Sequence, residues 1–348
     1  MQTLARRLAE IQPQLAQVLE AFAGCCADLA GRIAKPAFNQ EIGSEKGGIN
    51  ASGDLQHGLD AYADKLFIEG LRKAPVAWLV SEEEEGAVAL NPCDTRNAPY
   101  ALAIDPLDGS SNIDTNASIG SILGVYQASN NPAASFAHKG EEQLAAAIAV
   151  YGPRTQLWLT TGQGAQLYLL DRDSGEFILA NAQVQVPPET SEFAINASNY
   201  RHWPAPVRHY IETCLEGKEG ERKRNFNMRW LASMVGEAAR IFHRGGVFWY
   251  PADSRKGYTN GRLRLLYEAM PIAMLMEQAG GLCFNEQGRV LDQTAASLHQ
   301  RTGLLFGSRN EAGYAQRQFQ ADAGRAQNLP LFGKHSLFHP DFSNPQER

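Results

Sequence analysis

The chain has 348 residues, of which 44% are hydrophobic and 20% are charged; this composition is ordinary for a globular protein and excludes collagen-like, coiled-coil and predominantly disordered chains. Its 32 basic and 38 acidic side chains give a net charge of -6, which provides no general attraction to nucleic acid or to an anionic membrane. An anionic substrate would therefore need metal ions or individually placed Arg and Lys side chains. At about 150 residues per domain, the length predicts two domains.

The first half of the chain predicts helices followed by a largely antiparallel sheet. Apolar residues recur at helical spacing over residues 3–33 and again over 55–73, on either side of a glycine-rich stretch. Short apolar runs then alternate with turn residues. From these runs we predict strands at 76–80, 100–104, 119–126, 144–151, 156–161, 166–170 and 177–180.

Beyond Pro187 and Pro188 the pattern becomes an alternation of strands and helices, as in an α/β layer. We predict strands at 193–196, 247–250, 282–285 and 303–308, and helices at 206–215, 230–242, 262–279 and 311–321. The proline pair is the expected domain boundary. It divides the chain into an N-terminal domain (1–188), a C-terminal domain (189–321) and a tail (322–348).

The cysteine pattern and the N-terminal segment indicate the cellular compartment of the chain. The five cysteines are scattered and include no Cys-x-x-Cys pair, which favours reduced thiols in a cytoplasmic protein. The N-terminal segment lacks the apolar core of a secretory signal, and the longest uncharged run, 116–137, is rich in Ser, Asn and Gly. We therefore expect a cytoplasmic chain with neither a membrane nor a nucleic-acid partner.

The strongest motif is DPLDGSSNID at residues 105–114, which follows a predicted buried strand. Pro106 is expected to end the hydrogen-bond ladder, so that the carboxylates of Asp105 and Asp108 can face one point beyond the strand. Residues 109–111 offer successive N–H groups and two hydroxyls at an expected helix start, an anion nest suited to phosphate. Because two carboxylates repel phosphate, a hard divalent cation, Mg²⁺ or Mn²⁺, is expected between them. The alternative is an ordinary Asx-rich turn that caps a helix.

Two further acidic residues, Glu82 and Glu83, directly follow the predicted strand 76–80 and would emerge at a sheet end, as Asp105 does. We expect one to bind metal and the other to act as an acid or base. A run of four glutamates is more often a solvated surface, and that remains our interpretation of Glu84 and Glu85.

Glu268 lies among apolar residues of the predicted helix 262–279, where an ionised carboxylate needs a partner. Arg264, four residues earlier, would supply an ion pair. A metal ion is the alternative, and this segment does not decide between them. Arg262, at the expected helix start, is a candidate phosphate clamp. Asp54, before the second predicted helix, is explained well enough by helix capping.

Several carboxylates, a phosphate nest and the lack of a candidate protein nucleophile favour phosphate-ester hydrolysis by metal-activated water. The same residues resemble the class 1 fructose-1,6-bisphosphatases. The core at 105–109 is similar to that of the wider superfamily of Mg²⁺-dependent, lithium-sensitive phosphatases, which includes inositol monophosphatase. The full motif 105–114, together with 229–246, 250–252 and 261–268, resembles the bisphosphatase branch, and the resemblance covers roughly residues 10–315.

The resemblance implies a fold, an activity and an assembly. It implies a layered α/β fold, an αβαβα five-layer sandwich of the sugar phosphatase type, in a homotetramer. The implied reaction removes the 1-phosphate of D-fructose 1,6-bisphosphate, in gluconeogenesis or in carbon fixation. The N-terminal domain would bind metal and phosphate, and the C-terminal domain would bind the rest of the substrate.

The resemblance also implies roles for individual residues. Glu83, Asp60 and Asp54 would activate and orient the water. The implied ligands of Mg²⁺, or of Mn²⁺, are Glu82, Asp105, the backbone carbonyl of Leu107, Asp108 and Glu268. The implied substrate-binding residues are Asp108, Gly109, Ser110 and Ser111 for the 1-phosphate, and Asn196, Tyr200, Arg229, Trp230, Tyr250 and Arg262 for the sugar and 6-phosphate.

Three positions depart from the family pattern. Trp230 stands where the family usually has Tyr, Arg262 replaces Lys, and Met270 replaces Asn. Arg and Lys present the same charge with different geometry, so we expect these departures to alter sugar preference and not the chemistry. Arg229 resembles an arginine that reaches the 6-phosphate site of the adjacent subunit.

Three alternatives stay open. The enzyme could also act on sedoheptulose 1,7-bisphosphate, since nothing in the sequence separates one extra carbon. It could be an inositol or nucleotide phosphatase, although Arg229, Arg262 and Tyr250 favour a substrate with a second anionic group. It could be an inactive, metabolite-binding regulator, but an unfilled cluster of carboxylates would only repel itself.

Overall fold

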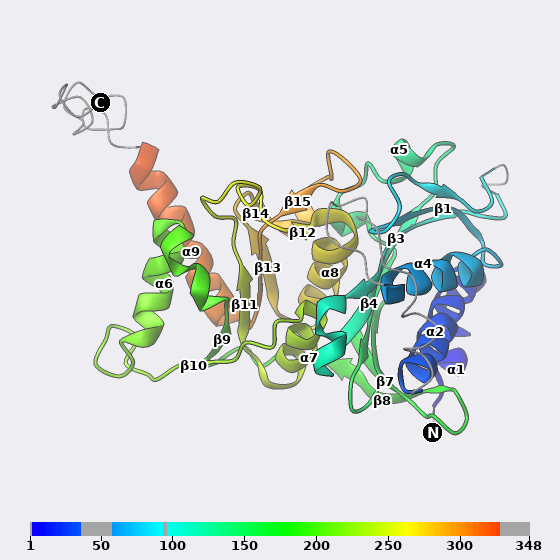
Figure 1. The fold of residues 1–348 in the computed structure, drawn as a ribbon, viewed down its shortest axis with the longest axis horizontal. Helices are drawn as coiled ribbons and strands as arrows, with labels where there is room; N and C mark the ends of the chain where they lie inside the picture. The colour runs from blue at the N-terminus through cyan, green and yellow to red at the C-terminus, as the bar shows by residue number, and fades with distance from the viewer. Residues whose placement is uncertain (1, 36–57, 93–95, 328–348) are drawn as a thin grey trace.

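The computed structural model describes residues 2–35, 58–92 and 96–327 of the chain. Asp54, one of the predicted catalytic residues, lies outside these described residues. Layers of helix and sheet alternate along the long axis of the molecule (Figure 1), in the order helices, sheet, helices, sheet, helices. The predicted αβαβα five-layer sandwich is therefore confirmed.

The helices pack in three of these layers. The first layer contains α1, α2 and α4, the middle layer α7 and α8, and the last layer α6 and α9 (Figure 1). The helices are α1 (Leu4–Leu8), α2 (Pro13–Ile33), α4 (Gly58–Leu71), α5 (Pro132–Ser135), α6 (Ala205–Leu215), α7 (Met234–Arg244), α8 (Met270–Gln278) and α9 (Arg309–Gln327). Short turns of tighter or wider helix are η1 (Ser110–Thr115), η2 (Gly140–Glu142), η3 (Ala197–His202), η4 (Leu265–Ala269) and η5 (Val290–Asp292).

Two large sheets separate the helical layers. The first has the order β2-β1-β3-β4-β5-β6-β7-β8, and the second has the order β10-β9-β11-β16-β13-β14. The first-sheet strands are β1 (Val76–Ser81), β2 (Val88–Ala89), β3 (Tyr100–Asp108), β4 (Ile119–Gln127), β5 (Ala145–Tyr151), β6 (Gln156–Thr160), β7 (Ala165–Leu170) and β8 (Phe177–Val184). The others are β9 (Glu192–Ala194), β10 (Asn227–Met228), β11 (Val247–Tyr250), β12 (Leu263–Arg264), β13 (Leu282–Asn285), β14 (Gly288–Arg289), β15 (Arg301–Thr302) and β16 (Leu304–Gly307), of which β12 and β15 form a separate pair.

The first sheet is antiparallel except where β1 pairs with β3 in parallel, so the predicted largely antiparallel arrangement is confirmed. Helices cover both of its faces, which explains why its central strands are apolar throughout and do not alternate. In β5, for example, Ala146 and Ile148 face the middle helices, whereas Ala145 and Ala147 face the first layer. A third apolar cluster fills the space between the second sheet and α6 and α9.

Two predicted helices begin later than expected. The helix expected at 230–242 begins at Met234, because Ser233 adopts an extended conformation and its side chain caps the helix. The helix expected at 262–279 starts instead as strand β12 and the π-helical turn η4, and α8 begins only at Met270. Pro271 explains this break, because it has no N–H to continue an α-helical ladder from the preceding turn.

Pro106 does not end its strand, contrary to our expectation. β3 continues through Asp108, and its pairing with β4 shifts register between Asp105, opposite Ile122, and Asp108, opposite Gly120. Three steps along β3 therefore oppose two along β4, which is a β-bulge. The bulge accommodates the proline, whose carbonyl oxygen accepts a hydrogen bond from Ser121 Oγ at 2.7 Å.

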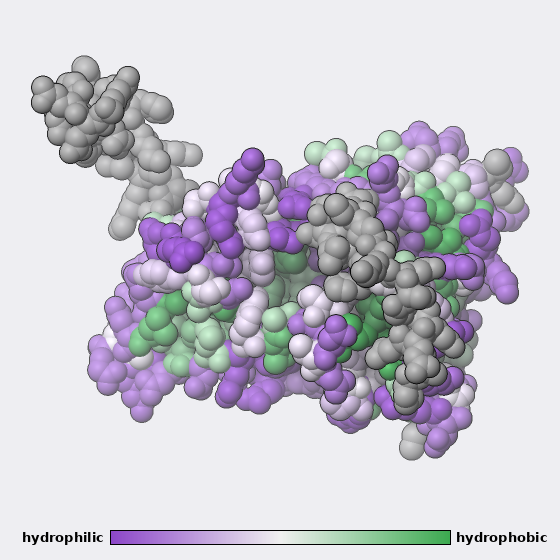
Figure 2. All heavy atoms as spheres, in the orientation of Figure 1, coloured by the Kyte–Doolittle hydropathy of each residue, from purple (hydrophilic) through white to green (hydrophobic). Residues whose placement is uncertain are grey.

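Hydrophilic side chains dominate the face of the molecule seen in Figure 2, with hydrophobic residues gathered in separate patches. No helix within the described ranges combines the length and the apolar character needed to cross a membrane. The strands of the first sheet end at Val184 and those of the second begin at Glu192. The domain boundary at 187–188 stays a prediction, since α7 and α8 from the second half pack against strands of the first sheet.

Candidate active site

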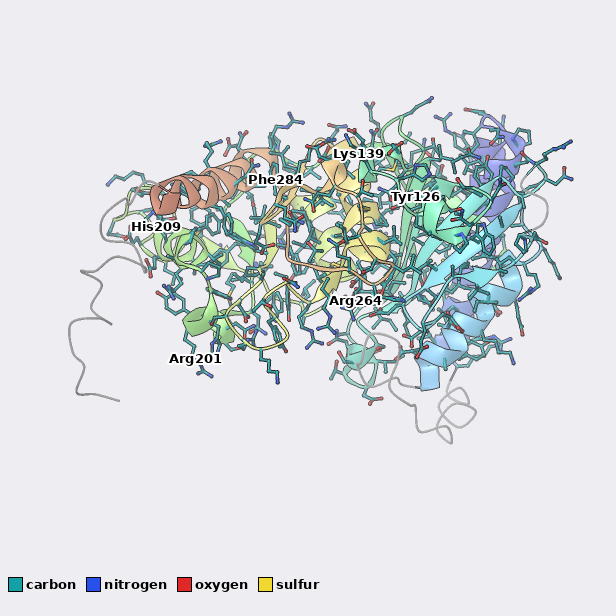
Figure 3. All side chains as sticks on the ribbon, turned by 90° about the horizontal axis from the view of Figure 1, so that it is seen from above. Tyr126, Lys139, Arg201, His209, Arg264 and Phe284 are labelled. Carbon is teal, nitrogen blue, oxygen red and sulfur yellow. The ribbon has the colours of Figure 1, made fainter. Side chains whose placement is uncertain are left out.

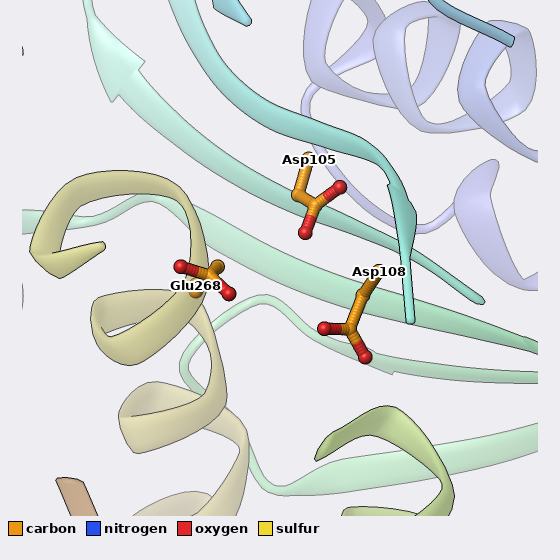
Figure 4. Close-up of side chains that lie close together, drawn as sticks. All are labelled: Asp105, Asp108 and Glu268. Carbon is orange, nitrogen blue, oxygen red and sulfur yellow. The ribbon is translucent and has the colours of Figure 1, made fainter. Parts of the chain in front are cut away.

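Three buried carboxylates converge between the first sheet and the middle helices (Figure 4). Asp105 and Asp108 come from β3, and Glu268 comes from η4. One oxygen atom of each lies within 4.8 Å of the others. Side chains three residues apart on a regular strand point to opposite faces, so the bulge at Pro106 is what returns Asp108 to the side of Asp105.

Backbone N–H groups hold each carboxylate of this acidic cluster in place. Asp105 Oδ1 accepts a hydrogen bond from Leu107 N at 2.9 Å, and Asp108 Oδ2 accepts one from Val235 N at 3.0 Å, at the start of α7. Glu268 Oε2 accepts a hydrogen bond from the backbone N–H of Arg264. Asp105 Oδ2 is buried and has no hydrogen-bond partner among the described residues.

The electrostatics of the cluster favour a bound cation. Burial raises the pKa of Asp105 well above its usual range, and the negative charges of Glu82, Asp108 and Glu268 raise it further. Burial also raises the pKa of Asp108 to about 6, although the N–H groups at the start of α7 oppose this rise. The pKa of Glu268 is raised by burial and by its acidic neighbours, and is lowered by Arg264. Hard oxygen donors with one unsatisfied oxygen fit a divalent cation such as Mg²⁺ or Mn²⁺.

Glu82 reaches the cluster because β1 and β3 are adjacent and parallel. Glu82 N donates to Ile104 O at 3.2 Å, which continues the β1–β3 ladder and brings Glu82 beside Asp105. Glu82 therefore follows the end of β1 as expected and lies beside Asp105, but Asp105 lies within β3 and not at its end. Glu82 Oε1 also lies 3.7 Å from the guanidinium of Arg264.

A cavity of about 510 Å³ opens over these carboxylates. It brings together the predicted site residues of the first half, apart from Asp54, which lies outside the described residues, and several from the second half. Among its lining residues are Asp60, Glu82, Glu83, Asp105, Leu107, Asp108, Gly109, Ser110, Ser111, Trp230, Tyr250, Arg262 and Glu268.

The segment predicted to bind phosphate forms a tighter turn than expected. Gly109 has φ +78°, a left-handed conformation that favours glycine, and Ser110 begins the 3-10 turn η1, where we had expected an α-helix. Asn112 Nδ2 donates to Ala232 O at 2.8 Å and ties this turn to the segment that precedes α7. The second half of the chain thus fixes the position of the nest.

The side of the cavity predicted to bind the sugar is formed by aromatic side chains and by Arg262. Trp230 stacks against Phe248, with ring centroids 5.9 Å apart, and lies 6.3 Å from the Tyr250 ring. Arg262 Nη1 donates to the hydroxyl of Tyr258 at 2.8 Å. Arg262 precedes strand β12 and is not at a helix start, which corrects our expectation for its local structure.

Three predicted substrate residues do not line this cavity. Asn196 accepts a hydrogen bond from Ser198 N at 3.3 Å and caps η3, and the hydroxyl of Tyr200 donates to Glu212. The side chain of Arg229 is half exposed, and its Nε lies 3.5 Å from Glu192 Oε1. Within one chain, the structure therefore brings together only part of the predicted substrate set.

Two residues were overlooked in the sequence: one lines the cavity, and the other is a buried acid next to strand β1. Arg264 is buried near the middle of the molecule (Figure 3), lines the cavity and contacts Glu82, whereas we had considered it only as a side-chain partner for Glu268. Asp64 is buried on α4, one turn after Asp60, and Asp64 Oδ1 accepts a hydrogen bond from Ser81 Oγ at 2.5 Å. Burial raises the pKa of Asp64 to about 6, and the neighbouring Glu84 adds to the rise. Glu84 is half-buried, whereas we expected a solvated side chain. The i, i+4 spacing from Asp60 was the signal for Asp64.

Comparison with known proteins gives consistent matches over most of the chain. A family model described as Fructose-1-6-bisphosphatase, N-terminal domain, matches residues 3–182, and one described as Fructose-1-6-bisphosphatase, C-terminal domain, matches residues 186–319. The protein called Fructose-1,6-bisphosphatase class 1 in Paracoccus denitrificans is 48% identical over 329 residues, which cover 94% of this chain and 96% of that relative. The protein of the same name in Methylobacterium radiotolerans is 45% identical over 346 residues, which cover 97% and 96% respectively.

A solved structure is similar over the same extent. The crystal structure of Leishmania major fructose-1,6-bisphosphatase in holo form superposes with a TM-score of 0.83 at 34% identity. The match covers 91% of this chain and 99% of the other.

Proposed function

The chain belongs to the fructose-1,6-bisphosphatase family and is a phosphoric monoester hydrolase, and on this premise we propose that it hydrolyses the 1-phosphate of D-fructose 1,6-bisphosphate to give fructose 6-phosphate and phosphate. The reaction is placed in this cavity because Asp105, Asp108 and Glu268 converge there beside residues 109–111, the proposed phosphate nest. Carboxylates repel a bound phosphate, so the two can occupy one cavity only if cations lie between them.

The residues that would hold the cation are Glu82, Asp105, Asp108, Glu268 and the backbone carbonyl of Leu107, with Mg²⁺ as the proposed ion and Mn²⁺ as the alternative. A divalent ion bound there supplies Lewis acidity to the phosphoryl oxygens and lowers the pKa of a bound water. The buried, unsatisfied Oδ2 of Asp105 supports this assignment.

Glu83 and Asp60 line the same cavity and are the proposed groups that orient the attacking water and accept its proton. As the water oxygen bonds to phosphorus, the bond from phosphorus to the C1 oxygen breaks, and the sugar oxygen takes up a proton. Asp54 is assigned the same role by resemblance alone. The N–H groups of residues 109–111 and the hydroxyls of Ser110 and Ser111 would hold the phosphate oxygens.

The sugar and the 6-phosphate would occupy the side of the cavity formed by Trp230, Tyr250 and Arg262. Arg229 would reach this region from a second copy of the chain, in a proposed homotetramer, and Asn196 and Tyr200 are retained as proposed contacts. The half-exposed side chain of Arg229 supports a role outside its own cavity. We place the enzyme in the cytoplasm, in gluconeogenesis or carbon fixation.

The test is release of inorganic phosphate in Mg²⁺ from three substrates assayed side by side: fructose 1,6-bisphosphate, sedoheptulose 1,7-bisphosphate and inositol 1-phosphate. Turnover of the first alone supports the proposal, and turnover of both sugars identifies a dual-function bisphosphatase. Turnover of inositol 1-phosphate at a comparable rate would contradict the need for a second anionic group. No turnover of any of them, with metal bound, would favour a metabolite-binding regulator.

A further inference from the structure

Three arginines converge on one carboxylate beside the candidate substrate arginine. Glu192 Oε2 accepts a hydrogen bond from Arg240 Nη1 at 2.9 Å, and Glu192 Oε1 accepts one from Arg244 Nη2 at 2.7 Å. The third arginine is Arg229, whose Nε lies 3.5 Å from Glu192 Oε1. Only 14% of the Glu192 side chain is exposed, so its charge is partly shielded from solvent.

The backbone holds Arg229 next to this carboxylate. Glu192 is the first residue of β9 and pairs with Asn227 of β10, and the N–H of Arg229 then donates to Phe193 O at 2.7 Å. Two residues on, Leu231 N donates to Glu237 Oε1 at 2.7 Å. The segment that carries Arg229 is therefore held at both ends.

The same network links these two anchors. Arg240 Nε donates to Glu237 Oε2 at 2.9 Å while its Nη1 donates to Glu192, so one buried guanidinium joins the two carboxylates. Glu237 is fully buried, and 11% of Arg240 is exposed. Loss of the Glu192 charge would leave three guanidinium groups near a single carboxylate, and their mutual repulsion would release the most weakly held of them, Arg229.

The contact with Glu192 determines which atoms Arg229 presents. The ion pair with Glu192 is made through Nε at 3.5 Å, and within the described ranges the two terminal amino groups of Arg229 donate no hydrogen bond. Those two groups form the fork that binds phosphate in a bidentate manner. The segment also faces outward, because Met228 and Leu231 on either side of Arg229 and Trp230 are 49% and 46% exposed.

We propose that Glu192 is a positioning residue for Arg229: it holds the guanidinium by Nε, so that the two terminal amino groups face a sugar phosphate bound by a second copy of the chain. This inference rests on the proposed role of Arg229 in substrate binding. It adds Glu192, a residue that does not itself contact the substrate, as a support for Arg229.

The test is a double-mutant cycle on the full-length enzyme with Mg²⁺ and fructose 1,6-bisphosphate. Glu192→Gln is expected to raise KM about fivefold while kcat stays within about twofold, because only a pre-formed substrate contact is lost. Arg229→Ala is expected to raise KM at least about tenfold. In the Arg229→Ala background, Glu192→Gln is expected to leave KM unchanged, since there is no longer an arginine to position.

The matched control is Glu189→Gln, three residues before Glu192. Its carboxylate contacts Arg224 and Asn310 and has no contact with Arg229, so KM should not change. Glu192→Asp keeps the charge of the network and guards against misfolding of Glu192→Gln. It should give a smaller rise in KM that also vanishes in the Arg229→Ala background, with oligomeric state and melting temperature recorded for every variant.

The outcomes distinguish the role of Arg229 from the role of Glu192. If Arg229→Ala leaves KM unchanged, the proposed role of Arg229 is wrong and the role of Glu192 is wrong with it. If Arg229→Ala raises KM but neither Glu192 variant does, only the positioning role is wrong. An equal rise in KM from Glu192→Gln in both backgrounds would show that Glu192 supports the fold and does not act through Arg229.

Discussion

The two sides of the cavity are built in different ways. The carboxylate side comes mainly from two adjacent strands, β1 and β3, joined by Glu268 of η4, and its key oxygens are buried and held by backbone N–H groups. The sugar side comes from separated segments of the second half, such as Trp230 and Arg262, and is held by ring stacking and side-chain hydrogen bonds.

This difference suggests a division of labour. Groups that must meet a cation within a few tenths of an ångström are placed on hydrogen-bonded backbone, which has little freedom. The groups proposed to bind the sugar and its second phosphate are side chains that can change without disturbing the sheet. Changes on the carboxylate side should therefore affect turnover, and changes on the sugar side should affect substrate affinity.

The largest effect is expected from Asp108→Asn, on the carboxylate side. Loss of a charged oxygen from the acidic cluster should weaken Mg²⁺ binding and lower kcat by about 10²–10³-fold. Calorimetric titration with Mg²⁺ and phosphate-release kinetics measure the two effects. Asp114→Asn is the matched control, because Asp114 belongs to the same motif but is exposed, and it should behave as wild type. Retained turnover in Asp108→Asn would contradict the metal assignment.

A smaller effect of a different kind is expected from Arg262→Ala, on the sugar side. Loss of a cationic partner for the second phosphate should raise KM for fructose 1,6-bisphosphate by about tenfold and change kcat little. Steady-state kinetics at saturating Mg²⁺ separate the two parameters. A fall in kcat with unchanged KM would show that the two sides do not divide the work in this way.

The acidic cluster should also make the metal-free protein sensitive to pH. The pKa of Asp108 is raised from 3.8 to about 6 in the folded chain, so the folded state binds this proton more tightly than the unfolded state does. The resulting stabilisation is complete below about pH 4 and disappears as the pH rises through about 6, a change of about 3 kcal/mol from this group. Asp105 and Glu268 act in the same direction.

Urea unfolding in a chelator between pH 4 and pH 8 measures this slope. The free energy of unfolding of Asp108→Asn should fall less steeply with pH than that of the wild type. Saturating Mg²⁺ should remove the difference at neutral pH, because the cation compensates the charges. Identical slopes for both proteins in the chelator would show that Asp108 does not carry the raised pKa.

The smallest effect is expected from Ala232→Gly, at the junction between the two sides. Ala232 has φ +56°, where an L-residue is strained by about 1–2 kcal/mol and glycine is not. The relief of strain is partly offset because glycine loses more backbone entropy on folding. The net result should be a free energy of unfolding that is higher by about 0.5–1 kcal/mol. Thermal unfolding measures this change, with Ala232→Val as the opposite control, since a β-branched residue should be destabilising there. A destabilised Ala232→Gly would show that the conformation is not strained.

Much of the carboxylate side could be predicted from the sequence because its signals are local. The run of apolar residues before Glu82, and the order of residues 105–114, predict acids and a phosphate-binding turn near strand ends without any long-range information. The apolar periodicity likewise predicted most strands and helices, whereas the layered αβαβα fold was implied by the resemblance to the class 1 fructose-1,6-bisphosphatases. The comparison with Leishmania major fructose-1,6-bisphosphatase agrees with that fold.

The tertiary structure decided how these pieces meet. Asp105 and Asp108 share a face because β3 bulges against β4, and Glu268 joins them because β12 pairs with β15 and Pro271 delays the start of α8. Both arrangements depend on strand pairings between residues far apart in the chain. The spacing of residues in the sequence does not reveal such pairings.

The sequence by itself determined which chemical groups the protein has and in what order: clustered acids, a phosphate nest and an arginine-bearing second half. Only the tertiary structure decided which of them act together, placing Arg264 between Glu82 and Glu268 and turning Arg229 away from its own cavity toward Glu192. The physical reason is that a motif fixes chemistry over a few residues, whereas a site depends on strand register and on charge pairs that form only when distant segments pack.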